Sequence, residues 1–182
     1  GHDNGVITLN IAEADDVERA MERKNMEELY RTLLGHFRHE IGHYYWDVLV
    51  DNTEFLEPCR QLFGDERMDY QEALDRHYHQ GSPADWMERY ISTYATMHPW
   101  EDWAETWAHY LHMTDSLDTA AACGFSLRPS RSDEPQMTAP RSGFHPARPF
   151  DLMIEDWLAL IYALNNLNRS MGLADGYPFV LA

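Results

Sequence analysis

The residues best suited to chemistry are His39, Glu40 and His43, which form an H-E-x-x-H pattern. Side chains four apart on a helix share one face, so both histidines can bind a single metal ion. Glu40 lies about 100° further round the helix axis than His39, beside such an ion. There it can take a proton from a water that the ion activates. The pattern therefore indicates a zinc hydrolase in which Glu40 is the general base.

The H-E-x-x-H pattern requires a helix, and the surrounding sequence predicts one. Apolar side chains recur at three- and four-residue steps from Leu29 to Val48. We expect this active-site helix to begin near Met26 and to run to about Val50. A chance occurrence of the pattern need not fall on an amphipathic helix, so a metal site is the favoured interpretation.

Two histidines leave a catalytic zinc ion one protein ligand short. The metzincin solution places a histidine six residues past the second motif histidine, but Leu49 stands there. The best candidate segment is the predicted helix after Pro99, where Glu101 and Glu105 lie one turn apart among tryptophans. A buried carboxylate needs a partner, and a divalent cation or a ligand histidine supplies one. Spacing alone leaves open which carboxylate is the ligand, and Asp102 could instead bond a ligand histidine if the helix is rotated.

The rest of the chain predicts a mainly α-helical protein with a small β element, which is an α+β fold class. The one convincing strand is Gly5–Ile11, where two sets of side chains alternate. It could hold an extended peptide at a sheet edge or could simply be a packing strand. Further helices are expected over 14–23, 53–63, 69–80, 84–96, 99–113, 117–122 and 150–171. A proline-rich loop is expected over 124–149.

Length and charge restrict the possible classes of function. The chain has 182 residues, which suits one domain over 1–182, and its net charge of -17 disfavours nucleic acid and anionic membranes as partners. Cys59 and Cys123 form neither a disulfide framework nor a thiolate zinc site, which suits a cytoplasmic protein. No apolar run is long enough to cross a bilayer. Because the chain begins with Gly1 and not Met, we expect a fragment that lacks an N-terminal part.

Two stretches carry a resemblance to a known family. Tyr30–Trp46 and His98–His112 resemble a bacterial family of zinc-binding metallopeptidases, as does Leu164–Gly172 near the end. More widely, the H-E-x-x-H motif with a later glutamate helix resembles the gluzincin metallopeptidases. The resemblance implies a zincin-like metallopeptidase domain that holds one Zn²⁺. It also implies a zinc-ribbon-like N-terminal part, which we expect to be missing here.

The resemblance further implies roles for individual residues. Glu101 matches the third zinc ligand, and Glu105 matches the carboxylate that holds a ligand imidazole in its tautomer. Tyr94 matches the tyrosine that hydrogen-bonds the oxyanion of the tetrahedral intermediate, although it could be a packing aromatic on the preceding helix. His36 is expected to be a partly exposed helix histidine.

We therefore expect a zinc metallopeptidase that hydrolyses a peptide or related amide bond, with a peptide or protein as its substrate. One alternative is a zinc-holding module that binds a peptide or serves as a scaffold without turnover. A second alternative is a metal-free helical interaction domain in which the motif is a coincidence. A measurement of bound metal separates the second alternative from the other two interpretations.

Overall fold

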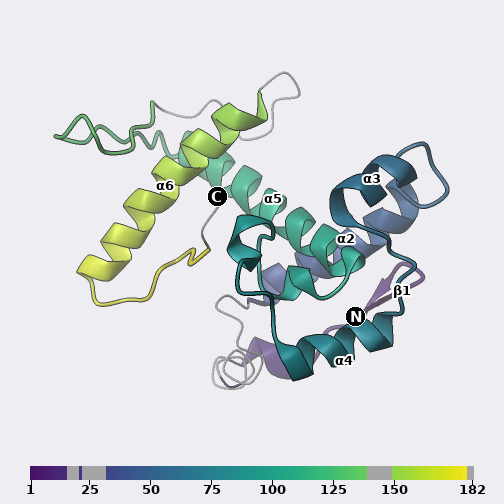
Figure 1. The fold of residues 1–182 in the computed structure, drawn as a ribbon. Helices are drawn as coiled ribbons and strands as arrows, with labels where there is room; N and C mark the ends of the chain where they lie inside the picture. Colours follow the sequence, from purple (N-terminus) through teal and green to yellow (C-terminus); the bar gives the residue numbers. More distant parts are fainter. Residues whose placement is uncertain (16–20, 22–31, 139–148, 180–182) are drawn as a thin grey trace. The chain divides into compact units, whose positions relative to one another are not determined.

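The structure is a computed structural model that describes residues 1–15, 21, 32–138 and 149–179 (Figure 1). Its described residues form five α-helices and one two-stranded sheet, so the predicted mainly helical α+β class is confirmed. The helices are α2 (Leu33–Leu49), α3 (Leu56–Phe63), α4 (Tyr70–Gln80), α5 (Pro99–Ala122) and α6 (Phe150–Ser170). The chain divides into two compact units, residues 1–109 with 179–182 and residues 110–178.

A short hairpin stands where the sequence predicted one strand over Gly5–Ile11. Strands β1 (His2–Asp3) and β2 (Val6–Ile7) pair antiparallel, with His2 opposite Ile7. The turn between them places Asn4 at φ 48° and Gly5 at φ 82°, the two positive angles that a tight hairpin turn favours. The single-strand prediction is wrong because this Asn-Gly turn lies at its start.

Helix α2 carries the H-E-x-x-H motif and begins later than predicted. Thr32 has an extended backbone, and its side chain accepts a hydrogen bond from the Gly35 N–H at 2.9 Å. This N-cap satisfies a donor of the first turn, so the helix begins at Leu33 and not near Met26, which itself lies outside the described residues. The predicted end is confirmed, since Leu49 is the last helical residue and Val50 is the C-cap.

Helix α2 and the first part of α5 pack closely against each other. A Cβ added to Gly42 would lie 3.0 Å from Cα of Ala104 and 3.2 Å from Cβ of Trp107. Ala104 is fully buried, and Trp103 donates its indole N–H to the Gly42 carbonyl at 2.8 Å. Two small residues therefore let the backbones approach, which brings the H-E-x-x-H turn against the first two turns of α5.

The helix predicted over 84–96 is absent, and two short 3₁₀ helices replace it. They are η2 (Trp86–Glu88) and η3 (Tyr94–Thr96). Ser92 lies between them, and its hydroxyl accepts from the Ala95 N–H at 3.1 Å. A serine side chain that bonds the backbone in this way competes with a continuous helix.

Helices α3 and α4 end where the sequence predicted. Helix α3 begins at Leu56 and not at Thr53, whose hydroxyl donates to the carbonyls of Leu49 and Val50 at the end of α2. Asp69 caps α4 and accepts from the Glu72 N–H at 2.8 Å, so the start of that helix is confirmed.

The unit of residues 110–178 contains the later part of α5 and all of α6. Helix α5 continues unbroken to Ala122, although the sequence predicted two helices over 99–113 and 117–122. Between those two ranges, the Thr114 hydroxyl donates to the Tyr110 carbonyl at 3.1 Å. Trp157 of α6 packs edge-on against Tyr177, with ring centroids 4.9 Å apart. The helix predicted over 150–171 is confirmed. The predicted loop contains one bridge between Leu127 and Met137, and its residues 139–148 lie outside the description, as does most of the helix predicted over 14–23.

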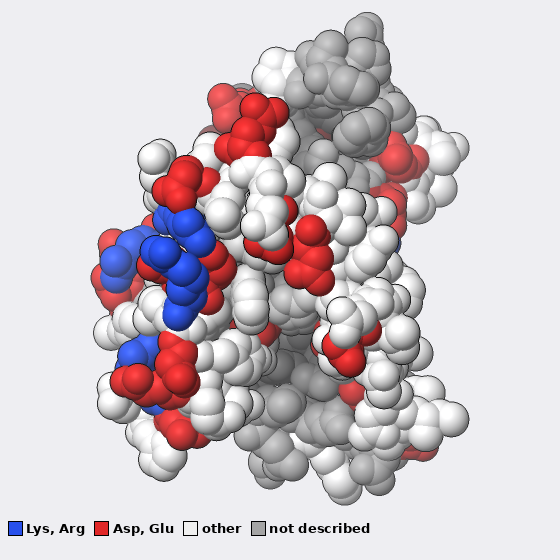
Figure 2. Space-filling model, turned by 90° about the vertical axis from the view of Figure 1, so that its right-hand side faces the viewer, with Lys and Arg blue, Asp and Glu red and all other residues white. Residues whose placement is uncertain are grey.

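Acidic side chains are spread over the face shown in Figure 2, whereas Lys and Arg gather in fewer places beside acidic groups. Three described arginines show the pattern, since Arg60 pairs with Glu66, Arg67 with Asp65 and Arg89 with Asp85. The Arg67 and Arg89 pairs are exposed, and exposed ion pairs add little to stability. In the described ranges, no helix combines the length and apolar character that a membrane span requires.

Candidate metal centre

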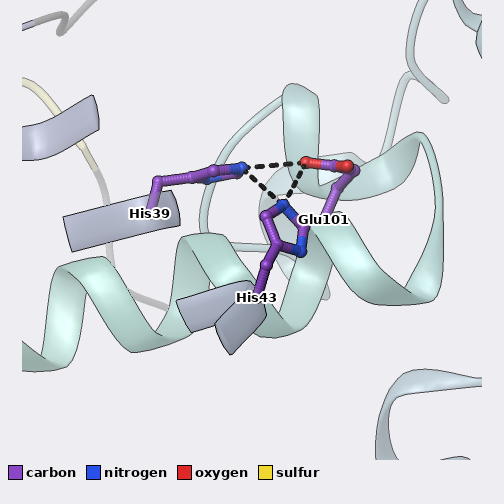
Figure 3. A group of neighbouring side chains, drawn as sticks. All are labelled: His39, His43 and Glu101. Carbon is purple, nitrogen blue, oxygen red and sulfur yellow. Dashed lines mark hydrogen bonds and ion pairs between the residues drawn. The ribbon is translucent and has the colours of Figure 1, made fainter. Parts of the chain in front are cut away.

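Three side chains from two helices converge on one point, as Figure 3 shows. Nε2 of His39 lies 3.1 Å from Nε2 of His43 on the same face of α2. Oε2 of Glu101, from the first turn of α5, lies 2.9 Å from Nε2 of His39 and 3.5 Å from Nε2 of His43. The fold thus brings together the two motif histidines and the carboxylate that the family resemblance implied.

The geometry and chemistry of these three atoms fit a zinc ion. Ligand atoms about 2.0–2.1 Å from a tetrahedral zinc lie about 3.3 Å from one another, close to the three observed separations. Oε2 of Glu101 is buried and has no hydrogen-bond partner of good geometry among the described residues. A buried carboxylate oxygen needs such a partner or a cation. Two imidazoles and one carboxylate form a ligand set that zinc accepts while a fourth position stays open.

The other oxygen of Glu101 is held by Tyr70, the first residue of α4. The Tyr70 hydroxyl donates to Oε1 at 2.9 Å. Burial, and then the charge of Glu101, raise the pKa of Tyr70, so the phenol keeps the proton that it donates. His98 packs against the Tyr70 ring and binds the Met68 carbonyl at 3.1 Å, which anchors the start of α4. Sequence reasoning missed Tyr70, because a contact across 31 residues leaves no local pattern.

The far nitrogen of His39 is held by Glu105. Nδ1 donates to Oε1 of Glu105 at 2.7 Å, and Ser92 donates its hydroxyl to Oε2 at 2.6 Å. With the proton on Nδ1, the ring can present Nε2 to an ion. Burial lowers the pKa of His39, but Glu101 and then Glu105 outweigh it and raise the pKa to about 10. The carboxylates that favour a positive ring also favour a cation at this place.

Glu40 lies beside the three candidate ligands and is almost fully buried. Its Oε1 accepts a hydrogen bond from Nε2 of His36 at 3.0 Å. Burial alone would raise the pKa of Glu40, but the hydrogen bond from His36 contributes to a net lowering. Glu40 is therefore a carboxylate at neutral pH, which is the form a general base requires.

The site opens into a cavity of about 430 Å³. The three candidate ligands line it together with Glu40, Tyr70 and Tyr94. The Tyr94 ring lies 6.0 Å from the His39 ring, and Tyr94 begins η3 and not the longer helix that was expected. Burial, and then the charge of Glu101, raise the pKa of Tyr94, so its hydroxyl stays a donor.

Comparison with known proteins places this site in a family. Residues 1–182 match the model of a family described as "Putative zinc-binding metallo-peptidase". The chain belongs to this family. Its relatives include uncharacterized proteins of Mycobacterium bovis and of two strains of Mycobacterium tuberculosis, each 52% identical over 182 residues. The match covers 100% of this chain and 51% of each relative, so the chain spans about half their length. No solved structure gives a significant match.

In this zinc-binding metallopeptidase family member, two further titratable groups of α5 lie near Glu105. Burial, and then the charge of Glu105, raise the pKa of Asp102 to about 7. Burial lowers the pKa of His109 to about 4, so this ring is neutral. The sequence left open whether Asp102 bonds a ligand histidine. Of the described residues, Glu105 makes that contact with Nδ1 of His39.

Proposed function

We propose that this chain is the catalytic domain of a zinc-dependent metallopeptidase that hydrolyses a peptide or related amide bond. The observation that carries the proposal is the convergence of His39, His43 and Glu101 beside Glu40, at the wall of a cavity. All four residues lie in the unit of residues 1–109, which contains the whole of the proposed site. The family match supports the same class of activity.

Nε2 of His39, Nε2 of His43 and Oε2 of Glu101 would hold the ion. Zinc bound there would supply a Lewis acid that polarises the substrate carbonyl and makes a water more acidic. Glu105 and Tyr70 keep the ligands in place, since Glu105 fixes the His39 ring and Tyr70 fixes the Glu101 carboxylate.

Glu40 moves the proton in the proposed reaction. Its carboxylate takes a proton from the attacking water as the water oxygen bonds to the carbonyl carbon. When the carbon–nitrogen bond breaks, the same proton passes to the leaving amine, and Glu40 returns to its ionised form. The lowered pKa of Glu40 is consistent with its starting as the base.

Tyr94 is proposed to stabilise the oxygen that gains negative charge during attack. Its hydroxyl keeps its proton, and its ring lines the cavity near His39. A protonated donor beside a developing oxyanion lowers the barrier more than it stabilises the substrate. The expected substrate is a peptide or protein, because the matching family is described as a metallo-peptidase.

The decisive experiment compares metal content with turnover in this 182-residue chain. We expect about one zinc per chain by elemental analysis, and cleavage of members of a peptide library. Glu40→Gln should keep the zinc but lose hydrolysis by a factor of about 100 or more, because it removes only the base. Glu88→Gln, at an exposed position outside the cavity, is the matched control and should change neither.

Two other outcomes would reject the proposal. A folded wild-type protein without zinc would contradict the metal site itself. A zinc-loaded protein that binds library peptides but cleaves none would instead support the zinc-holding module without turnover.

A further inference from the structure

The proposed general base, Glu40, contacts His36, which in turn contacts the buried carboxylate of Glu13. His36, on the first turn of α2, places Nε2 3.0 Å from Oε1 of Glu40 and Nδ1 2.7 Å from Oε2 of Glu13. Glu13 belongs to the 3₁₀ helix η1 (Ile11–Ala14) and is only 2% exposed. The contacts form a continuous chain from Glu13 through His36 to Glu40. Sequence position had predicted only a partly exposed helix histidine.

Both ring nitrogens of His36 face carboxylate oxygens. An ionised carboxylate only accepts hydrogen bonds, so each nitrogen must carry a proton for both bonds to form. The ring is then a cation between two anions, and it is one partner of the buried Glu13 carboxylate. The hydrogen bond to Glu40, and then that to Glu13, raise the pKa of His36 against the opposing effect of burial.

His36 does not compete for the metal. Its two nitrogens are engaged away from the cluster of His39, His43 and Glu101. Its bond reaches Oε1 of Glu40, the same oxygen that lies 3.2 Å from the amino group of Gly1, and among the described residues no hydrogen bond engages Oε2. The arrangement therefore fixes one oxygen of the base and leaves the other available to a water.

We propose that His36, held in place by Glu13, is a positioning residue that orients Glu40 for proton transfer. This inference rests on the proposed function, because that function assigns the role of general base to Glu40. The imidazolium anchors Oε1 by a charge-assisted hydrogen bond, so the carboxylate does not need to be ordered anew in each turnover. Glu13 restricts the rotation of the ring and keeps Nδ1 protonated.

The first test needs neither zinc nor substrate. Besides the protonated His39 ring, nitrogen-15 NMR of this chain, metal-free and labelled at its histidines, should show a second imidazole with both nitrogens protonated at pH 7, and this second signal should vanish in His36→Gln. Glu13→Gln, which keeps the size of the side chain, should lower the pH at which that ring loses its proton. A neutral His36 ring with one unprotonated nitrogen at pH 7 would overturn the proposal.

The second test separates positioning from folding. His36→Ala should lower kcat on a cleaved library peptide by about 10–100-fold, with KM and zinc content unchanged. His36→Gln should recover part of the loss, because its amide N–H can still donate to Glu40. His79→Ala, an exposed histidine of α4, is the control and should retain wild-type kcat.

The outcomes distinguish this inference from the proposed function. Unchanged kcat in His36→Ala would overturn the positioning role while leaving the peptidase intact. Equal losses of kcat, zinc and thermal stability in both His36 variants would also overturn it, because they would show a purely structural role. If the wild-type protein cleaves nothing, the proposed function fails, and with it the role of His36 in turnover. The NMR result still decides whether the Glu13–His36–Glu40 contact exists.

Discussion

Glu101 and Glu105 lie on successive turns of α5, yet their carboxylates face opposite nitrogens of the His39 imidazole. Glu101 directs Oε2 to Nε2 of His39 at 2.9 Å and receives the Tyr70 hydroxyl on Oε1. Glu105 directs Oε1 to Nδ1 of His39 at 2.7 Å and receives the Ser92 hydroxyl on Oε2. The helical repeat brings both carboxylates to one ring. The orientation of that ring then decides which of them shares a site with the second histidine.

Removal of the first carboxylate should have the largest effect. We expect Glu101→Ala to lower zinc affinity by more than about 100-fold, because it removes a ligand, whereas a residue that only orients a ligand is worth about 10–100-fold. Glu105→Ala should fall in that smaller range, since all three proposed ligand atoms remain. Competition with a chromogenic chelator measures both affinities. The reverse order would assign the ligand role to Glu105.

A substitution at the close contact between α2 and α5 should have the next largest effect. Gly42→Ala would place a methyl group 3.0 Å from a backbone atom of Ala104, so the helices must separate. We expect a loss of about 1–3 kcal/mol in the free energy of unfolding. Zinc affinity should also fall, because the shift of α5 moves Glu101 away from the two histidines. Chemical denaturation of the metal-free protein measures the loss. Glycine to alanine inside an open helix stabilises by about 0.5–1 kcal/mol, so an increase in stability would contradict the contact.

Zinc binding should depend on pH with a predictable sign. The pKa of His39 is raised to about 10 because the two carboxylates outweigh burial, so the ring is protonated near pH 7. An ion at Nε2 must release that proton, and apparent zinc affinity should therefore rise about tenfold per pH unit between pH 6 and 8. Calorimetry in buffers of different ionisation enthalpy counts the protons. Glu105→Gln should reduce this release, and binding without any release would contradict the assigned charges.

The two hydroxyl donors should give the smallest effects on zinc. Tyr70→Phe and Ser92→Ala each remove one hydrogen bond to a carboxylate that is present before any metal binds. A hydrogen bond to a charged group contributes about 1.5–3 kcal/mol. Most of this free energy should therefore be lost from folding stability and not from zinc binding. Zinc affinity should fall by less than about tenfold in either variant. A loss in Tyr70→Phe as large as that in Glu101→Ala would mean that Glu101 cannot face the site without its hydroxyl partner.

The errors made from sequence share a physical cause. The predicted start of α2 and the helix expected over 84–96 both relied on apolar spacing. In each case a hydroxyl side chain, Thr32 or Ser92, bonds the backbone and outweighs that spacing. The strand expected over Gly5–Ile11 failed in a similar way, because the turn chemistry of Asn4 and Gly5 outweighs the alternation that follows.

By itself, the sequence determined what helix geometry makes inevitable. His39 and His43 must share a face because they are four residues apart, and Glu101 and Glu105 repeat that spacing on a second helix. Only the tertiary structure decided how the two faces meet. The absence of a side chain at Gly42 lets α5 come close enough for Oε2 of Glu101 to reach both imidazoles.

The partners of the site residues also depended on tertiary structure. Tyr70, Ser92 and Glu13 reach their targets across 31, 13 and 23 residues of sequence respectively. Spacing within one element says nothing about such contacts, because they exist only after separate segments have packed together. Local periodicity thus identified the residues that could do chemistry, and packing decided how each of them is oriented and charged.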